Sequence, residues 1–160
     1  MKFFDVNQEP IEKPEDAVIH WRISGYPLVI KDGKILTVTS TWNPLKELPG
    51  GGIEIGESIA EGVVRECYEE SGYRIELGSN IPIHVGERNF YSDIDEKFYQ
   101  AIILIYPARL LSDEQDESVI NTVVENEIEK VEWIKLTDLT KEQCIPIIWP
   151  AIEKQQNGQD

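Results

Sequence analysis

The sequence is poor in several residue types, and each shortage excludes a class of protein. Its 160 residues include only two cysteines, Cys67 and Cys144. Two cysteines cannot build a disulfide scaffold, and no Cys-x-x-Cys spacing indicates zinc, so both are predicted to be partly buried small apolar residues. No apolar run approaches the roughly 18 residues of a membrane span. The first 16 residues lack the apolar core of a signal peptide, which predicts a cytoplasmic location.

Basic residues are also scarce, because 15 Lys and Arg face 30 Asp and Glu, for a net charge of −15. General binding to nucleic acid or to an anionic membrane needs a basic surface, so neither is expected. A small anionic substrate stays compatible with this charge, since a bound divalent cation can reverse the local field.

No internal repeat and no linker divides the chain, and its length suits one compact domain. We predict a Glu- and Pro-rich N-terminal arm over 1–16, a single domain over 17–153, and a polar, frayed tail over 154–160. Strands are predicted at 17–23, 27–30, 35–39, 73–77, 83–85, 98–106 and 131–134, and a hairpin turn at Asp32-Gly33. A helix is predicted over 57–71, and a capping box at Thr140 to Gln143 predicts the start of a last helix. Strands on both sides of a central helix indicate an α/β/α sandwich with a mixed β-sheet.

Three glutamates gather on one face of the predicted central helix. Glu66 and Glu70 lie about 40° apart around the helix axis, and Glu69 lies about 60° to the other side of Glu66. These acids fall in the C-terminal half of the helix, where the macrodipole disfavours negative charge. A hard cation such as Mg²⁺, which prefers carboxylate oxygens, would remove the repulsion. A solvated acidic face is the alternative when these three residues are taken alone.

The wider spacing favours the metal site. Gly51 is followed after five residues by Glu57 and after seven more by Arg65-Glu66-Cys67-Tyr68-Glu69-Glu70-Ser71-Gly72-Tyr73. This resembles the Nudix box, G-x5-E-x7-R-E-U-x-E-E-x-G-U, where U is a bulky apolar residue. All seven specified positions match, and a chance match at a given start is on the order of one in 10⁸. Cys67 departs from the usual aliphatic residue but is apolar enough to pack.

The resemblance implies a Nudix-like fold over about residues 17–153 and a role for each matching residue. Glu66 and Glu70 would be the main metal ligands, Glu69 a further ligand or a catalytic residue that orients water, and Gly51 or Gly50 a carbonyl ligand. Arg65 would hold the cluster in register by pairing with Glu57 or a ligand carboxylate. The implied cofactor is Mg²⁺, with Mn²⁺ as a substitute.

Outside the box the predictions rest on position. Nudix enzymes often take a further acid from a later loop as base or ligand, and Glu127 is our choice, with Glu125 and Glu129 as rivals. Arg88 is predicted to bind substrate, with Gly50 and Gly52. The aromatic residues Trp42, Phe90 and Tyr91 could stack on a base, although packing is the commoner role of an aromatic side chain.

The reaction that the resemblance implies is Mg²⁺-dependent hydrolysis of a diphosphate linkage in a nucleoside diphosphate joined to another group. The alternative is a non-catalytic Nudix module that binds a nucleotide as a sensor, which would not need all three helix glutamates. The expected partner is a small nucleotide or nucleotide conjugate. Family members are often dimers, so a homodimer is a candidate state, but the sequence does not require one.

Overall fold

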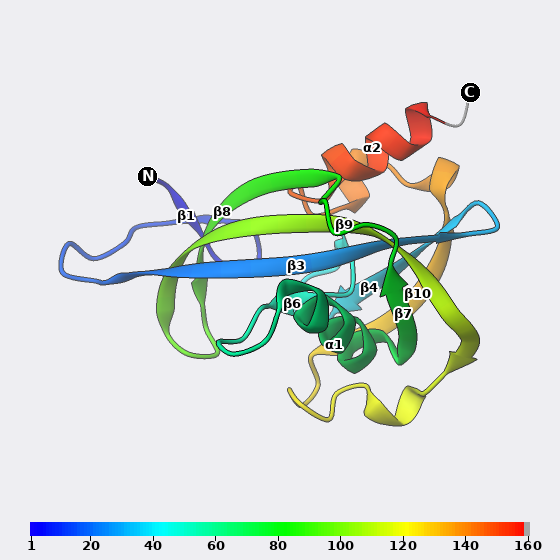
Figure 1. Ribbon diagram of the computed structural model, residues 1–160. Helices are drawn as coiled ribbons and strands as arrows, with labels where there is room; N and C mark the ends of the chain where they lie inside the picture. The colour runs from blue at the N-terminus through cyan, green and yellow to red at the C-terminus, as the bar shows by residue number, and fades with distance from the viewer. Residues whose placement is uncertain (159–160) are drawn as a thin grey trace.

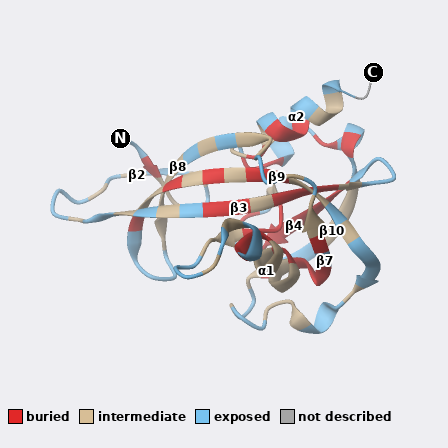
Figure 2. Cartoon of the chain, in the orientation of Figure 1, coloured by how far each residue is buried: buried red, intermediate tan, exposed pale blue. Residues whose placement is uncertain are grey.

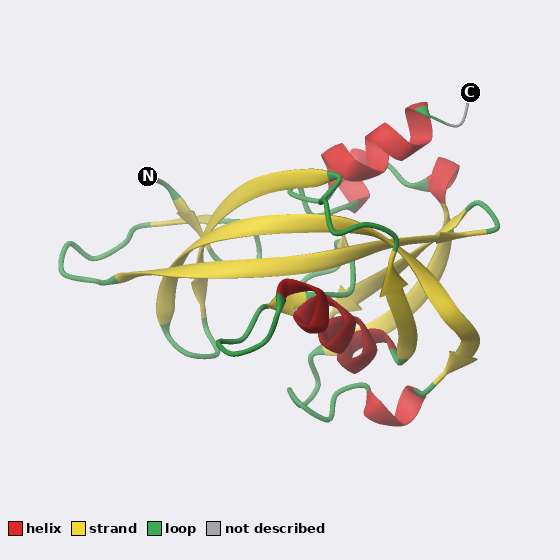
Figure 3. Ribbon diagram, viewed as in Figure 1, coloured by secondary structure: helices red, strands yellow, loops and turns green. Residues whose placement is uncertain are grey.

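The computed structural model describes residues 1–158 and consists of one mixed sheet with helices on both faces (Figures 1 and 3). The strands are β1 (Phe3–Phe4), β2 (Pro10–Ile11), β3 (Ile19–Lys31), β4 (Lys34–Ser40), β5 (Lys46–Glu47), β6 (Gly51–Gly52), β7 (Tyr73–Leu77), β8 (His84–Ser92), β9 (Lys97–Gln115) and β10 (Ile128–Lys135). The α-helices are α1 (Ile59–Ser71) and α2 (Trp149–Asn157), and the 3-10 helices are η1 (Glu117–Val119), η2 (Leu136–Asp138) and η3 (Lys141–Gln143). No helix in this part of the chain is long and apolar enough to cross a membrane.

The ten-stranded sheet has the order β10-β4-β3-β9-β8-β1-β2, with β5, β6 and β7 attached to its sides. Its centre is the parallel pair β3–β9, in register from Ile19 opposite Phe98 to Val29 opposite Ala108. β8 runs antiparallel to β9, and β10 antiparallel to β4. The combination of parallel and antiparallel pairs confirms the predicted mixed sheet.

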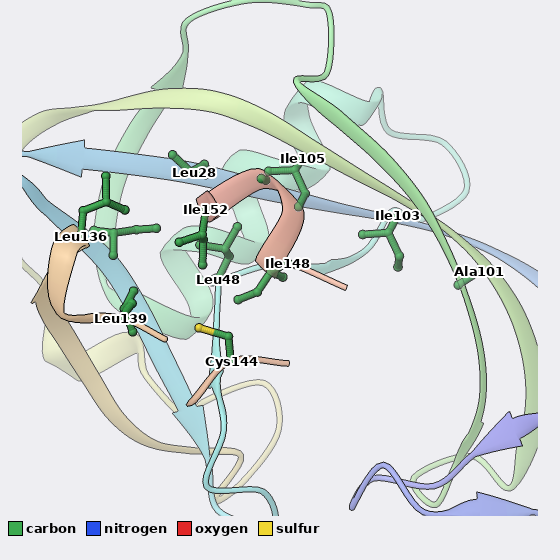
Figure 4. Packing of buried hydrophobic residues seen from close by; sticks show 12 residues of the cluster. Leu28, Leu48, Ala101, Ile103, Ile105, Leu136, Leu139, Cys144, Ile148 and Ile152 are labelled. Atoms are coloured by element: carbon green, nitrogen blue, oxygen red, sulfur yellow. The ribbon is translucent and has the colours of Figure 1, made fainter. Parts of the chain in front are cut away.

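The two faces of the sheet bury different cores. Alternate residues of a strand point to opposite faces, so Ile103 and Ile105 of β9 pack on the α2 side, whereas Leu104 and Tyr106 pack on the α1 side. Figure 4 shows the α2-side cluster, in which Ile152 of α2 packs with strand residues such as Leu28 and with loop residues such as Leu48. The predicted α/β/α sandwich is therefore confirmed.

Local signals account for helix α1. Ser58 caps the N-terminus in a capping box with Glu61, and Gly72 ends the helix in the left-handed region at φ 72°. One side of the helix faces the sheet, since Val63 and Cys67 are fully buried and Ile59 packs against the same core. Cys144 is also buried, so both cysteines are free and more deeply buried than predicted.

The predicted hairpin is present, but its first strand is longer than expected. Asp32 and Gly33 both have positive φ, 50° and 71°, as a two-residue hairpin turn requires. The two strands predicted at 17–23 and 27–30 form the single strand β3. Gly25 lies at the join, where an added Cβ would come within 2.4 Å of a Val63 methyl of α1. The glycine therefore marks a close helix–sheet approach and not a strand break.

The prediction that the Thr140 capping box opens the last helix is wrong. The capping box exists, but it starts only the 3-10 helix η3. Pro146 disfavours helical backbone at Ile145, and the amide of Ile145 instead donates to the Lys46 carbonyl at 3.0 Å. Helix α2 begins later, at Trp149.

Both ends of the described chain are more ordered than predicted. Phe3 of β1 is buried and packs edge-on against Phe98 with ring centroids 5.2 Å apart, and β1 pairs with β8, so part of the expected loose arm belongs to the sheet. At the other end, Gln156 lies within α2 and donates to the carbonyls of Leu136 and Leu139. The tail predicted as frayed is thus helical through Asn157; its last residues, 159 and 160, lie outside the described part.

Candidate active site

Arg65 on α1 connects the helix to the segment 50–52, which we call the glycine-rich loop. Its guanidinium donates to both carboxylate oxygens of Glu57, with Nε–Oε2 3.0 Å and Nη2–Oε1 2.7 Å. It also donates to Glu66 and Glu69, each at 3.0 Å, and to the Gly52 carbonyl at 3.1 Å. These hydrogen bonds lower the pKa of Glu57 to about 2. A single cation therefore holds the loop and two helix carboxylates in register, and it pairs with both kinds of partner that were predicted for it.

Glu70 lies beneath the loop in an enclosed environment. Its Oε2 accepts a hydrogen bond from the Gly50 amide at 2.8 Å. Burial, and then the charges of Glu127, Glu66 and Glu47, raise the pKa of Glu70 well above its usual range. The loop needs glycine at position 50, because φ is +155° and a Cβ would come within 2.5 Å of the Gly25 carbonyl oxygen.

Glu66 lies against the backbone of the next glycine. A Cβ at Gly51 would lie 2.7 Å from Glu66 Oε2, so only glycine lets the chain approach this carboxylate so closely. Burial is the largest cause of the raised pKa of Glu66. The box therefore brings the Gly51 backbone close to the Glu66 carboxylate.

Glu127, from the loop before β10, completes the acidic cluster. Its pKa is raised by burial and by the charge of Glu66. The rivals Glu125 and Glu129 are exposed, and neither lines the cavities described below. Of the three candidate acids, the structure thus places Glu127 beside the helix glutamates, whereas Glu129 lies on β10.

Two adjoining cavities meet at these carboxylates. The outer one, about 260 Å³, is lined by Arg65 and Glu69 among others, and we call it the outer cleft. The inner one, about 360 Å³, is lined by Trp42, Glu47, Arg88 and Phe90 among others, and we call it the inner cavity. Seven residues line both: Arg22, Glu66, Glu70, Ser92, Ile94, Glu127 and Ile128. The acidic cluster therefore stands at the junction of the two spaces.

Residues 20–154 match the NUDIX domain. The chain belongs to the Nudix family. A diphosphoinositol polyphosphate phosphohydrolase 3-alpha from Mus musculus is 30% identical over 131 residues, which are 80% of this chain and 72% of the mouse protein.

Other Nudix proteins match more narrowly or in fold alone. An ADP-ribose pyrophosphatase from Methanocaldococcus jannaschii is 42% identical over 57 residues, which are 34% of each protein. The chain spans less than half the length of several bacterial relatives. The crystal structure of a MutT NUDIX hydrolase from Burkholderia pseudomallei has a TM-score of 0.61 at 23% identity and covers 84% of this chain and 97% of that one. At this identity the likeness shows the shared Nudix fold.

The residues that the sequence suggested for substrate contact fall into two groups. Arg88, Trp42, Phe90 and Tyr91 all line the inner cavity, and so does Gly50. Gly52 is instead covered by the Arg22 guanidinium, since a Cβ there would lie 2.7 Å from Nη2. Gly52 therefore contacts the side chains of Arg22 and Arg65. The substrate-binding role of Gly52 stays a prediction.

Two polar residues of the site were missed by sequence reasoning. Arg22 of β3 lines both cavities, and its guanidinium lies 5.9 Å from the Phe90 ring and 5.6 Å from the Tyr99 ring. Glu47 of β5 lines the inner cavity, and burial raises its pKa to about 7. The one available signal for Glu47 was its place just before the glycine-rich loop, which is a position the Nudix box does not cover.

The donor set of the acidic cluster fits a hard divalent cation. Within residues 1–158, no three Asp, Glu, His or Cys side chains converge closely enough to form a ready metal cage, and Arg65 holds one oxygen each of Glu66 and Glu69. The cluster is nevertheless short of positive charge. After burial, the charges of Glu127 and Glu66 raise the pKa of Glu70, the charge of Glu66 raises that of Glu127, and α1 has no basic residue in its last turn. Carboxylate and carbonyl oxygens with unbalanced negative charge are what Mg²⁺ or Mn²⁺ binds.

Proposed function

We propose that this Nudix protein hydrolyses a diphosphate linkage in a nucleoside diphosphate joined to another group, with Mg²⁺ as cofactor. The observation that carries the proposal is the junction of the two cavities, where Glu66, Glu70 and Glu127 meet the glycine-rich loop. Burial raises the pKa of all three carboxylates, and such a cluster of perturbed acids is typical of a functional site.

The proposed ligands of Mg²⁺ are Glu66, Glu70 and the Gly51 carbonyl, with Glu69 as a further ligand. Bound there, Mg²⁺ would neutralise phosphate oxygens and make a water molecule more acidic. Mn²⁺ offers the same preference for oxygen ligands and is expected to substitute.

The protein groups supply the remaining functions. Glu127 is the proposed general base, because burial raises its pKa and lets it accept a proton more readily at neutral pH. Glu69 would orient the attacking water if it does not bind the metal. Arg65 is a positioning residue, since its bonds to Glu57, Glu66 and Glu69 hold the carboxylates in place.

Cavity chemistry favours a nucleotide over a more heavily phosphorylated ligand. The name of the mouse relative refers to a diphosphoinositol polyphosphate, and such a ligand would need many cationic partners. The inner cavity offers two arginines, Arg22 and Arg88, against five acids: Glu47, Glu66, Glu70, Asp93 and Glu127. Its aromatic lining suits a flat base.

A substrate panel tests the proposal. It would contain dNTPs, 8-oxo-dGTP, ADP-ribose, NADH, dinucleoside polyphosphates, capped RNA and a diphosphoinositol polyphosphate, each with Mg²⁺ and with EDTA. We expect turnover of at least one nucleotide that requires metal and is lost in Glu70→Gln. Turnover that survives both EDTA and Glu70→Gln would contradict the mechanism. Tight nucleotide binding without any turnover would instead favour the alternative of a Nudix sensor.

A further inference from the structure

Two groups of opposite charge line the inner cavity close to one another. Glu47 and Arg88 both line this cavity, and neither lines the outer cleft. They are close enough for the charge of Arg88 to oppose the rise in the pKa of Glu47 that burial causes. No ion pair joins them, however, among the salt bridges of residues 1–158. An acceptor and a donor therefore stand near one another with room between them.

Neither group is engaged by the neighbours that could neutralise it. Lys46, the residue next to Glu47, pairs with Glu132 and donates to Thr39 Oγ1 at 3.0 Å. Nε of Arg88 is buried without a hydrogen-bond partner in the described structure. A buried donor left unpaired is destabilising, so this arginine is poorly explained as a structural residue. The pair is better explained as part of a binding site.

The walls of the inner cavity suit a planar ligand. The Arg88 guanidinium lies 5.2 Å from the centre of the Phe90 ring, which restricts its position. Trp42 and Tyr91 add aromatic surface, and Trp42 keeps 38% of its area exposed although it lines the cavity. A ligand in this space would have one end at Glu47 and Arg88, and its other end could reach the Glu66, Glu70 and Glu127 junction.

We propose that Glu47 and Arg88 read the hydrogen-bonding edge of a guanine base. This rests on the proposed function, because the diphosphate of the same molecule would lie at the acidic junction. Guanine presents a carbonyl, a ring N–H and an amino group in a row. The Arg88 guanidinium would donate to the carbonyl O6, and the two oxygens of Glu47 would accept from N1–H and from the amino group.

The other bases fit this pair less well. Adenine presents a ring nitrogen acceptor where guanine has N1–H, so the Glu47 carboxylate would meet a lone pair. Uracil has a carbonyl and an N–H in the right order, but its second carbonyl would face the carboxylate. Hypoxanthine keeps O6 and N1–H and lacks only the amino group, so it removes one of the three contacts. The expected order of affinity is therefore guanine, hypoxanthine, then adenine and uracil.

Calorimetric titration of the wild-type protein with GMP, IMP, AMP and UMP, each with Mg²⁺, tests this order. A well-placed two-point contact discriminates by roughly 10- to 100-fold, so GMP should bind at least about 10-fold more tightly than AMP and UMP, with IMP between them. Equal binding of GMP and AMP would overturn the proposal. This measurement needs no substitution, so it does not depend on whether a variant folds.

Matched variants then locate the discrimination. Glu47→Gln should lose most of the preference for GMP over AMP, because the amide has a single acceptor oxygen and its NH2 group would face a guanine donor. Arg88→Lys should also weaken GMP binding, since lysine keeps the charge but not the planar fork. Glu87→Gln, an exposed acid beside Arg88 on β8, is the control and should keep the wild-type order. A full GMP preference in Glu47→Gln would overturn the assignment.

The two proposals fail in different ways. If the base preference is absent but some nucleotide is hydrolysed with metal, the guanine proposal falls and the hydrolase proposal stands. If GMP is preferred but no diphosphate is cleaved, the base site stands and the hydrolase proposal falls. The comparison of kcat/KM for GTP and ATP in wild type and Glu47→Gln links the two, because only the GTP value should drop.

Discussion

The outer cleft and the inner cavity differ in how their residues are held. In the outer cleft, Arg65 connects Glu57, Glu66 and Glu69, all within fifteen positions of one another along the chain. The inner cavity is lined by Glu47 of β5, Arg88 of β8 and Trp42 of a loop, which come from separate segments of the chain. The first region is a local motif tied by one cation, whereas the second exists only when the sheet is assembled. Reaction chemistry is expected to depend on the first region and substrate choice on the second.

The largest expected effect comes from removing a proposed metal ligand at the junction of the two cavities. Glu70→Gln keeps the shape but loses the charge, and we expect kcat to fall by roughly 10³-fold or more, since metal stabilisation of phosphate charge is worth several kcal/mol. The loss should be the same for every substrate. Steady-state kinetics on two nucleotides measure it. A fall in kcat for only one of the two nucleotides would contradict the assignment of reaction chemistry and base choice to separate regions.

The next effect concerns the loop acid. Glu127→Gln should lower kcat by about 10²- to 10⁴-fold, the usual contribution of a general base. Glu125→Gln is a matched control, because Glu125 is exposed two residues away and should retain wild-type turnover. Both variants should have the wild-type Tm. Equal losses in the two variants would remove the special role of Glu127.

A smaller effect is expected from the aromatic wall of the inner cavity. Trp42→Ala should raise KM by roughly 5- to 100-fold with little change in kcat, because stacking on a base contributes about 1–3 kcal/mol. Trp42 is 38% exposed, so the Tm should change little. Trp21→Ala, an exposed tryptophan outside both cavities, serves as the control. A kcat effect as large as that of Glu127→Gln would show that the regions are not separable.

The smallest expected effect is on the free energy of unfolding, which should depend on pH through the pair of Arg65 and Glu57 beside the outer cleft. Hydrogen bonds from Arg65 lower the pKa of Glu57 to about 2 from an ordinary 4.5. The ionised carboxylate therefore stabilises the fold above about pH 4.5, and this contribution is lost as the pH falls towards 2. Glu57→Gln should be less stable than wild type by about 1–2 kcal/mol at pH 7.

Urea unfolding of both proteins between pH 7 and pH 2.5 measures this difference. The difference in free energy of unfolding between wild type and Glu57→Gln should become smaller as the pH falls. A gap that stays constant over this range would show that the Arg65–Glu57 pair does not depend on the carboxylate charge. Glu114→Gln, a substitution of an exposed acid on β9, should give no gap at either end of the range.

Strand β3 shows why the inner cavity was harder to predict than the box. Its apolar residues Ile19, Trp21 and Ile23 are all exposed, whereas Arg22 between them lies against the cavity. Figure 2 shows β3 changing from exposed and intermediate positions in its N-terminal half to buried ones further along. Alternation alone would place the apolar residues inside and the polar ones in solvent. A concave polar site reverses that rule, because its interior must contact a charged ligand.

The C-terminal region shows the same limit for a local signal. The Thr140 capping box was a correct local prediction, yet only a 3-10 turn follows it. The bond from Ile145 to Lys46 joins residues far apart in sequence, and it takes the backbone out of a helical path. A hydrogen bond between such distant residues cannot be predicted from the local sequence around either of them.

The Nudix box, the helix that carries it, and the pairing of Arg65 with Glu57 and Glu69 follow from local sequence. These contacts join residues four to eight positions apart, so helix geometry and a short loop are enough to make them. Which candidate acid joins the cluster, and which residues line the inner cavity, depends on how distant segments pack together. Sheet pairing places β3, β5, β8 and the loop before β10, and so brings together Arg22, Glu47, Arg88 and Glu127. The residue spacing within any one segment does not predict that pairing.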